Sequence, residues 1–222
     1  MIRILAAVLM VIGAAWAVQA PVPVSSEQHH HFKFENEYVR VYDVLVPGHD
    51  ETLFHIHSND YVYVNLFDVD LKAQVLDGPI NSLPVKVGQC VFSKAPLTHR
   101  VLNPSDKLFR NITVEILKTP PASAEKSSVA GVPGYSTVLD NDRVHVDRLV
   151  LEPGQSTGMH KHSLMNLAIA VSGAKVAYME PGQSEQVSEL DPGDFSWHGQ
   201  PTTHSLKNVG ETRFEAIVIE WK

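Results

Sequence analysis

The sequence contains almost no cysteine. Among 222 residues only Cys90 carries a thiol, which excludes an internal disulfide. Cys90 stands in the strand-like run "GQCVFS", and we expect it to be a buried thiol that packs as a small hydrophobic group. Stability must then come from a hydrophobic core. A chain of this length with 44% hydrophobic residues can bury one.

Positive charge is also in short supply. The chain has 18 Lys and Arg against 25 Asp and Glu, for a formal net charge of −7. Because no basic patch stands out, nucleic acid and anionic membranes are poor candidates for a partner. The sequence also lacks a phosphate-binding loop, a dinucleotide fingerprint and a nucleophile elbow. A small-molecule ligand or substrate is the partner that these absences leave, and self-association into a homodimer stays open.

Long hydrophobic runs are confined to the N-terminus. "MIR" supplies a positive start, and "ILAAVLMVIGAAW" is an apolar run too short to span a bilayer. "AWA" and "VQA" follow as small-residue cleavage motifs. We therefore predict a signal peptide over residues 1–20, no membrane span in the mature chain, and export to a periplasmic or extracellular location.

The sequence has no amphipathic helix of appreciable length. Apolar residues instead alternate with polar ones over 69–75 and 112–116, and both faces are apolar over 214–221. Turn signals such as "VPGHD", "LDGPINS" and "DPGD" separate these runs at short spacing. This pattern predicts an all-β sandwich or barrel.

The chain is an internal duplication. "FENEYVRVYDVLV" (34–46) is repeated as "LDNDRVHVDRLVL" (139–151), 105 residues later. Between the copies lies a stretch rich in Pro, Ala, Ser and Gly, which is linker composition. We predict one barrel domain over residues 27–120, a linker over 121–133 and a second barrel domain over 134–222.

Histidines recur at the same 105-residue spacing. "HIH" at 55–57 corresponds to "HKH" at 160–162, and a further histidine follows each pair: His99 and His204. On a strand, residues two apart share a face, as two metal ligands require. A single such pair can be an accident of an exposed strand, but two matched trios favour ligation. We predict that His55, His57, His99, His160, His162 and His204 bind a divalent transition metal, with zinc, iron, copper, nickel and manganese all left open.

These residues carry a family resemblance. "PGHDETLFHIHSNDYVYV" and "PGQSTGMHKHSLMNLAIAVSG" resemble the first cupin motif through the histidines, and "GQCVFSKAPLTHRVLN" and "GDFSWHGQPTTHSLKN" resemble the second. The chain after residue 20 is thus similar to a bicupin. The resemblance implies two tandem cupin-like jelly-roll β-barrels, each with a metal site inside its mouth.

The sequence departs from the cupin pattern at the glutamate ligand. Four residues after the second histidine of each pair stand Tyr61 and Asn166, which strand parity directs inward. Asp60 is the nearest carboxylate, but parity points it away from the histidines. Loss of the carboxylate should lower the preference for hard cations such as manganese. We predict Tyr61 as a catalytic proton donor in the first barrel.

Three other features receive a structural interpretation. "HHH" at 29–31 could chelate metal, but a mobile N-terminal tract is the simpler explanation. Parity places Arg100 on the face opposite His99, and Trp197 is expected in the core.

Three functional hypotheses follow. The first is an exported metal-binding bicupin with the oxygenase, isomerase or lyase activity on a small molecule that the resemblance implies. The second is a non-catalytic small-molecule-binding bicupin, and the third is a structural bicupin whose sites no longer bind. The vacant glutamate positions shift weight toward the second hypothesis, and the paired histidine trios count against the third. The fold by itself does not choose among them.

Overall fold

The computed structural model describes residues 20–120, 127 and 129–222. Within these residues the only helical element is the three-residue 3-10 turn η1 (Val24–Ser26), and all other elements are strands. The all-β prediction is therefore confirmed. No helix in the described ranges is long and apolar enough to cross a membrane. Residues 1–19 of the predicted signal peptide and residues 121–126 and 128 of the predicted linker lie outside the described residues.

Eleven strands form the first unit: β1 (Val22–Pro23), β2 (His30–Glu35), β3 (Val39–Val46), β4 (Asp50–Glu51), β5 (His55–His57), β6 (Tyr61–Asn65), β7 (Val69–Val75), β8 (Ile80–Val85), β9 (Cys90–Ser93), β10 (Leu97–Asn103) and β11 (Phe109–Ile116). Nine strands form the second: β12 (Tyr135–Asp140), β13 (Val144–Leu151), β14 (His160–His162), β15 (Asn166–Ala170), β16 (Ala174–Met179), β17 (Gln186–Leu190), β18 (Phe195–His198), β19 (Thr202–Asn208) and β20 (Phe214–Trp221). Strands β2, β3, β5, β6, β10 and β11 recur 105 residues later as β12, β13, β14, β15, β19 and β20. The duplication read from the sequence is therefore a duplication of structure.

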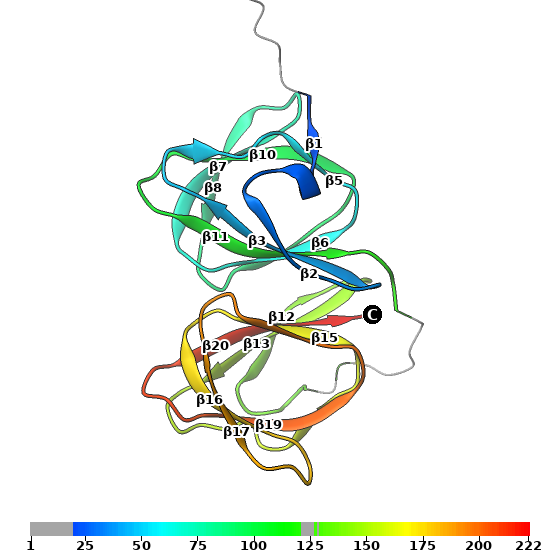
Figure 1. Ribbon diagram of the computed structural model, residues 1–222, viewed down its shortest axis with the longest axis vertical. Helices are drawn as coiled ribbons and strands as arrows, with labels where there is room; N and C mark the ends of the chain where they lie inside the picture. The colour runs from blue at the N-terminus through cyan, green and yellow to red at the C-terminus, as the bar shows by residue number, and fades with distance from the viewer. Residues whose placement is uncertain (1–19, 121–126, 128) are drawn as a thin grey trace, which may run out of the picture.

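Each unit consists of two sheets that face each other. In the first unit, the order β2-β3-β11-β6-β9 faces the order β1-β5-β10-β7-β8, to which β4 adds by pairing with β10. In the second unit, β12-β13-β20-β15-β18 faces β14-β19-β16-β17. The two units are stacked along the long axis of the molecule, and the C-terminus lies at their junction (Figure 1).

The largest apolar cluster lies between the two units. It joins buried side chains of both five-stranded sheets: Val39, Val41, Val62, Val64, Leu66, Ile112, Val114, Ile116, Val144, Val146, Leu167, Ile169, Val171, Ile217, Ile219 and Trp221. Two smaller clusters lie inside the individual barrels. The sequence indicated that the last strand is buried on both faces, and the structure gives the reason, because one face of β20 lines its barrel and the other packs against the first barrel.

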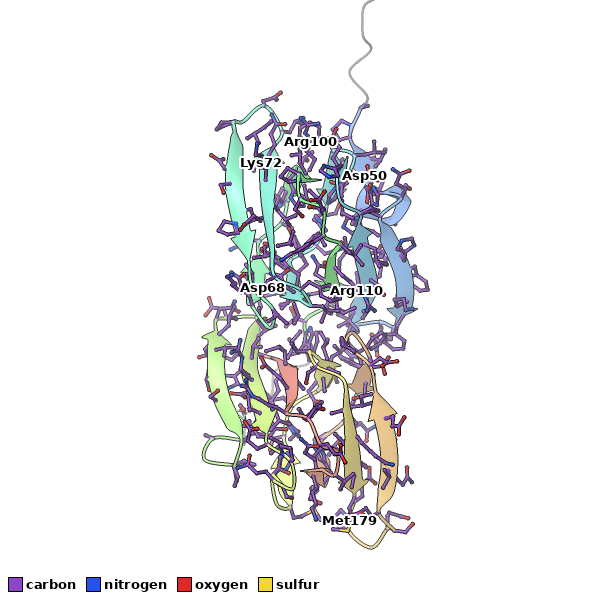
Figure 2. All side chains as sticks on the ribbon, turned by 90° about the vertical axis from the view of Figure 1, so that its left-hand side faces the viewer. Asp50, Asp68, Lys72, Arg100, Arg110 and Met179 are labelled. Atoms are coloured by element: carbon purple, nitrogen blue, oxygen red, sulfur yellow. The ribbon has the colours of Figure 1, made fainter. Side chains whose placement is uncertain are left out.

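Two arginines form ion pairs and inter-barrel hydrogen bonds at the edge of this junction. Arg110 binds both carboxylate oxygens of Asp43, at 2.8 and 2.9 Å, and donates to the carbonyl oxygen of Pro192 in the other barrel at 3.0 Å. Figure 2 places Arg110 at the end of the first barrel that meets the second. Arg148 of the second barrel pairs with Glu215 and donates to the carbonyl oxygen of Gly88 at 2.9 Å. Positions 43 and 148 correspond in the duplication, as do 110 and 215, so the two ion pairs have opposite polarity.

The asparagines of the second sequence motif are structural. Asn103 donates from Nδ2 to the carbonyl oxygens of Val46 (2.9 Å) and Lys107 (2.7 Å), which ties the end of β3 to the turn before β11. Asn208 makes the same two bonds to Leu151 (2.9 Å) and Thr212 (2.7 Å). Both asparagines are buried.

Substitution of Gly193 tests the junction. Gly193 has a φ of +93°, and a Cβ there would lie 2.7 Å from Nη2 of Arg110. Gly154 has a similarly positive φ of +81°, with open space around it. We expect Gly154→Ala to cost about 1 kcal/mol from backbone strain alone. Gly193→Ala should lower the free energy of unfolding, measured with urea, by at least about 1 kcal/mol more than Gly154→Ala, because it also displaces Arg110. If both variants lose the same free energy of unfolding, the Arg110 contact contributes nothing to stability.

Candidate metal centres

Strand pairing brings the predicted histidines of the first barrel together. His55 and His57 lie on β5, which pairs antiparallel with β10 so that His99 is directly opposite His55. The ring centroid of His99 is 4.5 Å from that of His55 and 5.3 Å from that of His57. The three side chains line one cavity, as the sequence pattern predicted.

A fourth imidazole, that of His30, completes this cluster. Its side chain is 5% exposed, and its ring centroid lies 4.6 Å from that of His55 and 5.9 Å from that of His57. The group whose nitrogen atoms all lie within 4.8 Å of one another is His30, His55 and His57, without the predicted His99. The interpretation of residues 29–31 as a mobile tract was wrong, because His30 begins the β2 strand and its ring is buried. The 105-residue offset relates His30 to Tyr135, and each residue begins a corresponding strand of its barrel.

Glu27 fixes the ring of His30. The two are joined by a 2.6 Å hydrogen bond from Nδ1 of His30 to Oε2 of Glu27, whose side chain is fully buried. The backbone N–H groups of His29 and Leu53 also donate to this carboxylate, at 3.0 and 3.2 Å. Burial acts to raise the pKa of Glu27, but the bonds from His30 and the two backbone groups outweigh it and hold the pKa below its ordinary value. With Nδ1 directed to the carboxylate, Nε2 is the ring nitrogen of His30 that is left to face a cation.

The second barrel repeats the histidine trio. His160 and His162 lie on β14, and His204 lies opposite His160 on β19. All three are buried, with nitrogen atoms within 4.8 Å of one another. Nδ1 of His160 is 3.1 Å from the carbonyl oxygen of Gly158, and Nδ1 of His162 is 2.9 Å from Oε1 of Glu220. Both Nδ1 atoms therefore donate, and the Nε2 atoms are the ring nitrogens left to face a cation.

The arrangement of these nitrogen atoms fits a bound cation. The Nε2 atoms of His160 and His162 are 3.2 Å apart in a buried volume, so in the neutral, metal-binding form of both rings two lone pairs face each other. In the first barrel, Nε2 of His55 and Nε2 of His99 are buried without a hydrogen-bond partner, while Nδ1 of His55 donates to the carbonyl oxygen of Leu53 at 2.9 Å. Ligating imidazoles characteristically donate from the nitrogen that does not face the metal.

Although the cupin glutamate position holds no carboxylate, each barrel has a buried glutamate near Nδ1 of the second histidine of its HxH pair. Glu220 on β20 holds His162, and Glu115 occupies the matching place on β11 but lies 4.0 Å from Nδ1 of His57. Arg40 accounts for the longer distance, because its Nη1 binds Oε2 of Glu115 at 3.2 Å. The corresponding residue of the second barrel is His145, which pairs with aspartates instead.

Tyr61 and Asn166 line the two cavities, as parity predicted. The Tyr61 ring stacks on that of His57 at 4.0 Å between centroids, and burial raises the pKa of its phenol to about 12. Asn166 is buried and donates to the carbonyl oxygen of Leu164. Asp60 does not face the histidines, because its Oδ1 accepts from the backbone N–H of Ala95.

Arg100, Trp197 and Cys90 lie outside the histidine clusters, as the sequence predicted. Arg100 binds Gln74 and Glu51 on the outside of the first barrel, away from His99. Trp197 packs against the cluster between the barrels, next to Trp221. Cys90 is partly buried against the same cluster, and its burial raises the pKa of the thiol to about 12.

Comparison with solved structures identifies the fold. AerE from Microcystis aeruginosa superposes with a TM-score of 0.61 at 13% identity, over 87% of this chain and 97% of AerE. Oxalate decarboxylase from Bacillus subtilis gives 0.58 at 11% identity, over 89% and 76% of the two chains. Salicylate 1,2-dioxygenase from Pseudoaminobacter salicylatoxidans gives 0.58 at 11% identity, over 83% and 69%. The chain has the two-barrel bicupin fold of these structures.

Sequence comparison of the bicupin adds one curated relative. A 79-residue segment is 28% identical to the (R)-mandelonitrile lyase of Granulicella tundricola and covers 33% of this chain. It spans 60% of the length of that enzyme. No family model matches the sequence.

The cavities of the bicupin differ in size. The first has a volume of about 200 Å³ and holds the four imidazoles together with Tyr61 and Tyr63. The second has a volume of about 320 Å³. Its polar groups include Asn166, Tyr178 and His198, next to His162 and His204. The second barrel therefore has more space beside its histidines.

Burial keeps most of these imidazoles neutral. It lowers the pKa of His55 to about 3, of His57 to about 2, of His99 to about 4 and of His204 to about 3, and the neighbouring rings add to the effect. The pKa of His160 is also lowered by burial. Neutral imidazoles are the form that binds metal.

These shifts predict acid sensitivity of the metal-free bicupin. The unfolded chain takes up protons on these histidines below about pH 6.5, whereas the folded chain resists protonation until about pH 4 or lower. The free energy of unfolding should therefore fall as the pH drops from 6.5 to 4. The slope should be about 1.4 kcal/mol per pH unit for each imidazole that only the unfolded chain protonates.

Urea unfolding in the presence of a chelator, at several pH values, measures this slope. A double variant, His55→Gln with His99→Gln, should have a shallower slope than the wild type because two such groups are removed. A slope that is the same in both proteins would contradict the assignment to these imidazoles.

Proposed function

We propose that this bicupin binds one divalent transition metal ion in each barrel. His30, His55, His57 and His99 would hold it in the first barrel, and His160, His162 and His204 in the second. The observation that carries the proposal is the 3.2 Å approach of two Nε2 lone pairs in the second barrel. Both Nδ1 protons there are committed elsewhere, so a cation is the simplest way to compensate the lone pairs.

The ligand chemistry narrows the choice of ion. Imidazole ligands suit zinc, copper, iron and nickel better than manganese, for which carboxylate oxygen is the better ligand. The centres of Bacillus subtilis oxalate decarboxylase contain Mn(II). For the present chain we propose zinc, iron, copper or nickel ahead of manganese, because the carboxylates Glu27 and Glu220 lie behind histidines.

We further propose that the bicupin is an enzyme acting on a small organic molecule, with the second barrel as the reaction site. A bound ion would supply Lewis acidity or a binding position for an oxygen atom. The chain's own contribution is the roomier cavity, where Asn166, Tyr178 and His198 can orient a ligand by hydrogen bonds. The names of the similar proteins include a lyase, a decarboxylase and a dioxygenase. Lyase and oxygenase chemistry are therefore classes to test, together with the isomerase chemistry that the cupin resemblance implies.

Tyr61 is the proposed proton donor for the alternative in which the reaction takes place in the first barrel. Its phenol is neutral at ordinary pH and lies against His57 inside the cavity. One observation favours a second, non-catalytic function for this barrel. Four imidazoles surround the smaller cavity, and four protein ligands with no open position are typical of structural rather than catalytic zinc. Metal storage or stabilisation in the first barrel is therefore the alternative.

Metal analysis tests the binding proposal. Protein isolated from its native host should contain close to two equivalents of transition metal per chain. The pair His55→Ala and His57→Ala should remove about one equivalent, and the pair His160→Ala and His162→Ala the other, because each pair removes half or more of one ligand set. Well-folded wild-type protein with less than about one tenth of an equivalent would overturn the proposal.

A carboxylate substitution tests the role of Glu27, with a second carboxylate substitution as its matched control. Glu27→Gln should weaken metal binding in the first barrel by about 10- to 100-fold, since it removes the acceptor that orients His30. Glu37→Gln changes an exposed carboxylate paired with Lys118 and should leave the affinity unchanged. Equal affinities in all three proteins would remove Glu27 from the site.

Turnover tests the assignment of the reaction to the second barrel. Dioxygen uptake and product formation should be measured with a panel of phenolic and dicarbonyl compounds. We expect the wild-type protein to be active with at least one compound. The His160→Ala and His162→Ala protein should lose this activity, because it lacks the histidines beside the larger cavity. The His55→Ala and His57→Ala protein should retain at least about one tenth of it. The reverse result would assign the reaction to the first barrel.

A further inference from the structure

The fourth position around each histidine trio is occupied by a different residue in the two barrels. His30 is the first residue of β2 and pairs with Val44, whereas Tyr135 is the first residue of β12 and pairs with Leu149. The positions correspond in the duplication. A histidine in one barrel and a tyrosine in the other therefore approach the same point of the site.

The Tyr135 hydroxyl lies as close to the ligand atoms as they lie to each other. Its oxygen is 3.4 Å from Nε2 of His160 and 3.4 Å from Nε2 of His162, and those two nitrogens are 3.2 Å apart. Around a zinc ion with ligand bonds of about 2.0–2.1 Å, two tetrahedral ligand atoms are separated by about 3.3–3.4 Å. The three atoms thus have the spacing of one face of a tetrahedral coordination shell.

Hydrogen bonding within the protein does not account for this arrangement. Nδ1 of His160 and Nδ1 of His162 donate to Gly158 and Glu220, so in the neutral form of both rings, the form that binds metal, both Nε2 atoms are acceptors. The phenol has one proton and can satisfy one of them, which leaves the other lone pair facing its neighbour. A cation among the three atoms satisfies all of them at once.

From this geometry, and resting on the proposed metal function, we propose that the Tyr135 phenolate is a metal ligand of the second barrel, together with His160, His162 and His204. Ligation transfers the phenolic proton to solvent and gives the site an anionic oxygen in place of the neutral imidazole of His30. The phenolate and the Glu220 carboxylate together would balance the charge of a divalent ion. The two barrels are then different metal sites, with four nitrogen ligands in one and three nitrogens and one oxygen in the other.

Copper(II) is a suitable probe, because it binds imidazole sites tightly and a coordinated phenolate gives it a visible charge-transfer absorption. We expect the metal-free wild-type protein to bind about two equivalents of copper(II), with a phenolate band for one of them. Tyr135→Phe should abolish the band and weaken the affinity of the second barrel by at least about tenfold, since even partners outside the coordination shell contribute that much. Tyr135→His, which copies the first barrel, should abolish the band and retain two equivalents of copper.

Two matched controls exclude the other tyrosines. Tyr61→Phe and Tyr178→Phe change phenols that contact His57 and His204 and should leave the band intact. The reciprocal change, His30→Tyr, should add a second phenolate band from the first barrel. Circular dichroism confirms that each variant is folded.

The outcomes separate the two proposals. Copper binding without a phenolate band, or a band that persists in both Tyr135→Phe and Tyr135→His, would overturn the ligand assignment and leave metal binding in place. Absence of tight copper binding by folded wild-type protein would overturn the metal function and the ligand assignment with it.

Discussion

The two central strands β11 and β20 carry both the junction and the sites. Each is buried along nearly its whole length, because one face packs in the apolar cluster between the barrels and the other faces a cavity. Ile112, Val114 and their counterparts on β20 belong to the junction, whereas Glu115 and Glu220 reach the histidines. Packing between the barrels thus fixes the strands from which the carboxylates behind the ligands project. A bicupin built this way has two sites on one shared core.

Duplication preserved the framework and changed the chemistry. Strand registers, the buried asparagines and the HxH strands are the same in both halves. The ion pairs at the junction have exchanged their signs, Arg40 has become His145, and His30 has become Tyr135. The preserved strand registers follow from backbone hydrogen bonding and apolar packing, which both copies need, and the asparagine side chains tie the same strand ends in each. The changed residues lie around the histidine clusters and at the contact between the copies.

The histidines that the sequence revealed share a simple local signature. Period two on β5 and β14 places His55 with His57 and His160 with His162, and strand pairing then supplies His99 and His204. His30 and Tyr135 lack such a signature, because each comes from a strand of the opposite sheet, which does not pair with the HxH strand. Their proximity depends on how the two sheets close over each other. Only the 105-residue correspondence hinted that positions 30 and 135 belong together.

The sequence by itself determined the all-β class, the duplication and the HxH faces, since alternation, turn residues and a constant offset are local or periodic properties of a chain. Tertiary structure decided which residues complete each site, which carboxylates lie behind the ligands, and how much room remains beside them. Those features depend on contacts between strands of different sheets. Such contacts follow from the packing of the barrels, which no short stretch of sequence specifies.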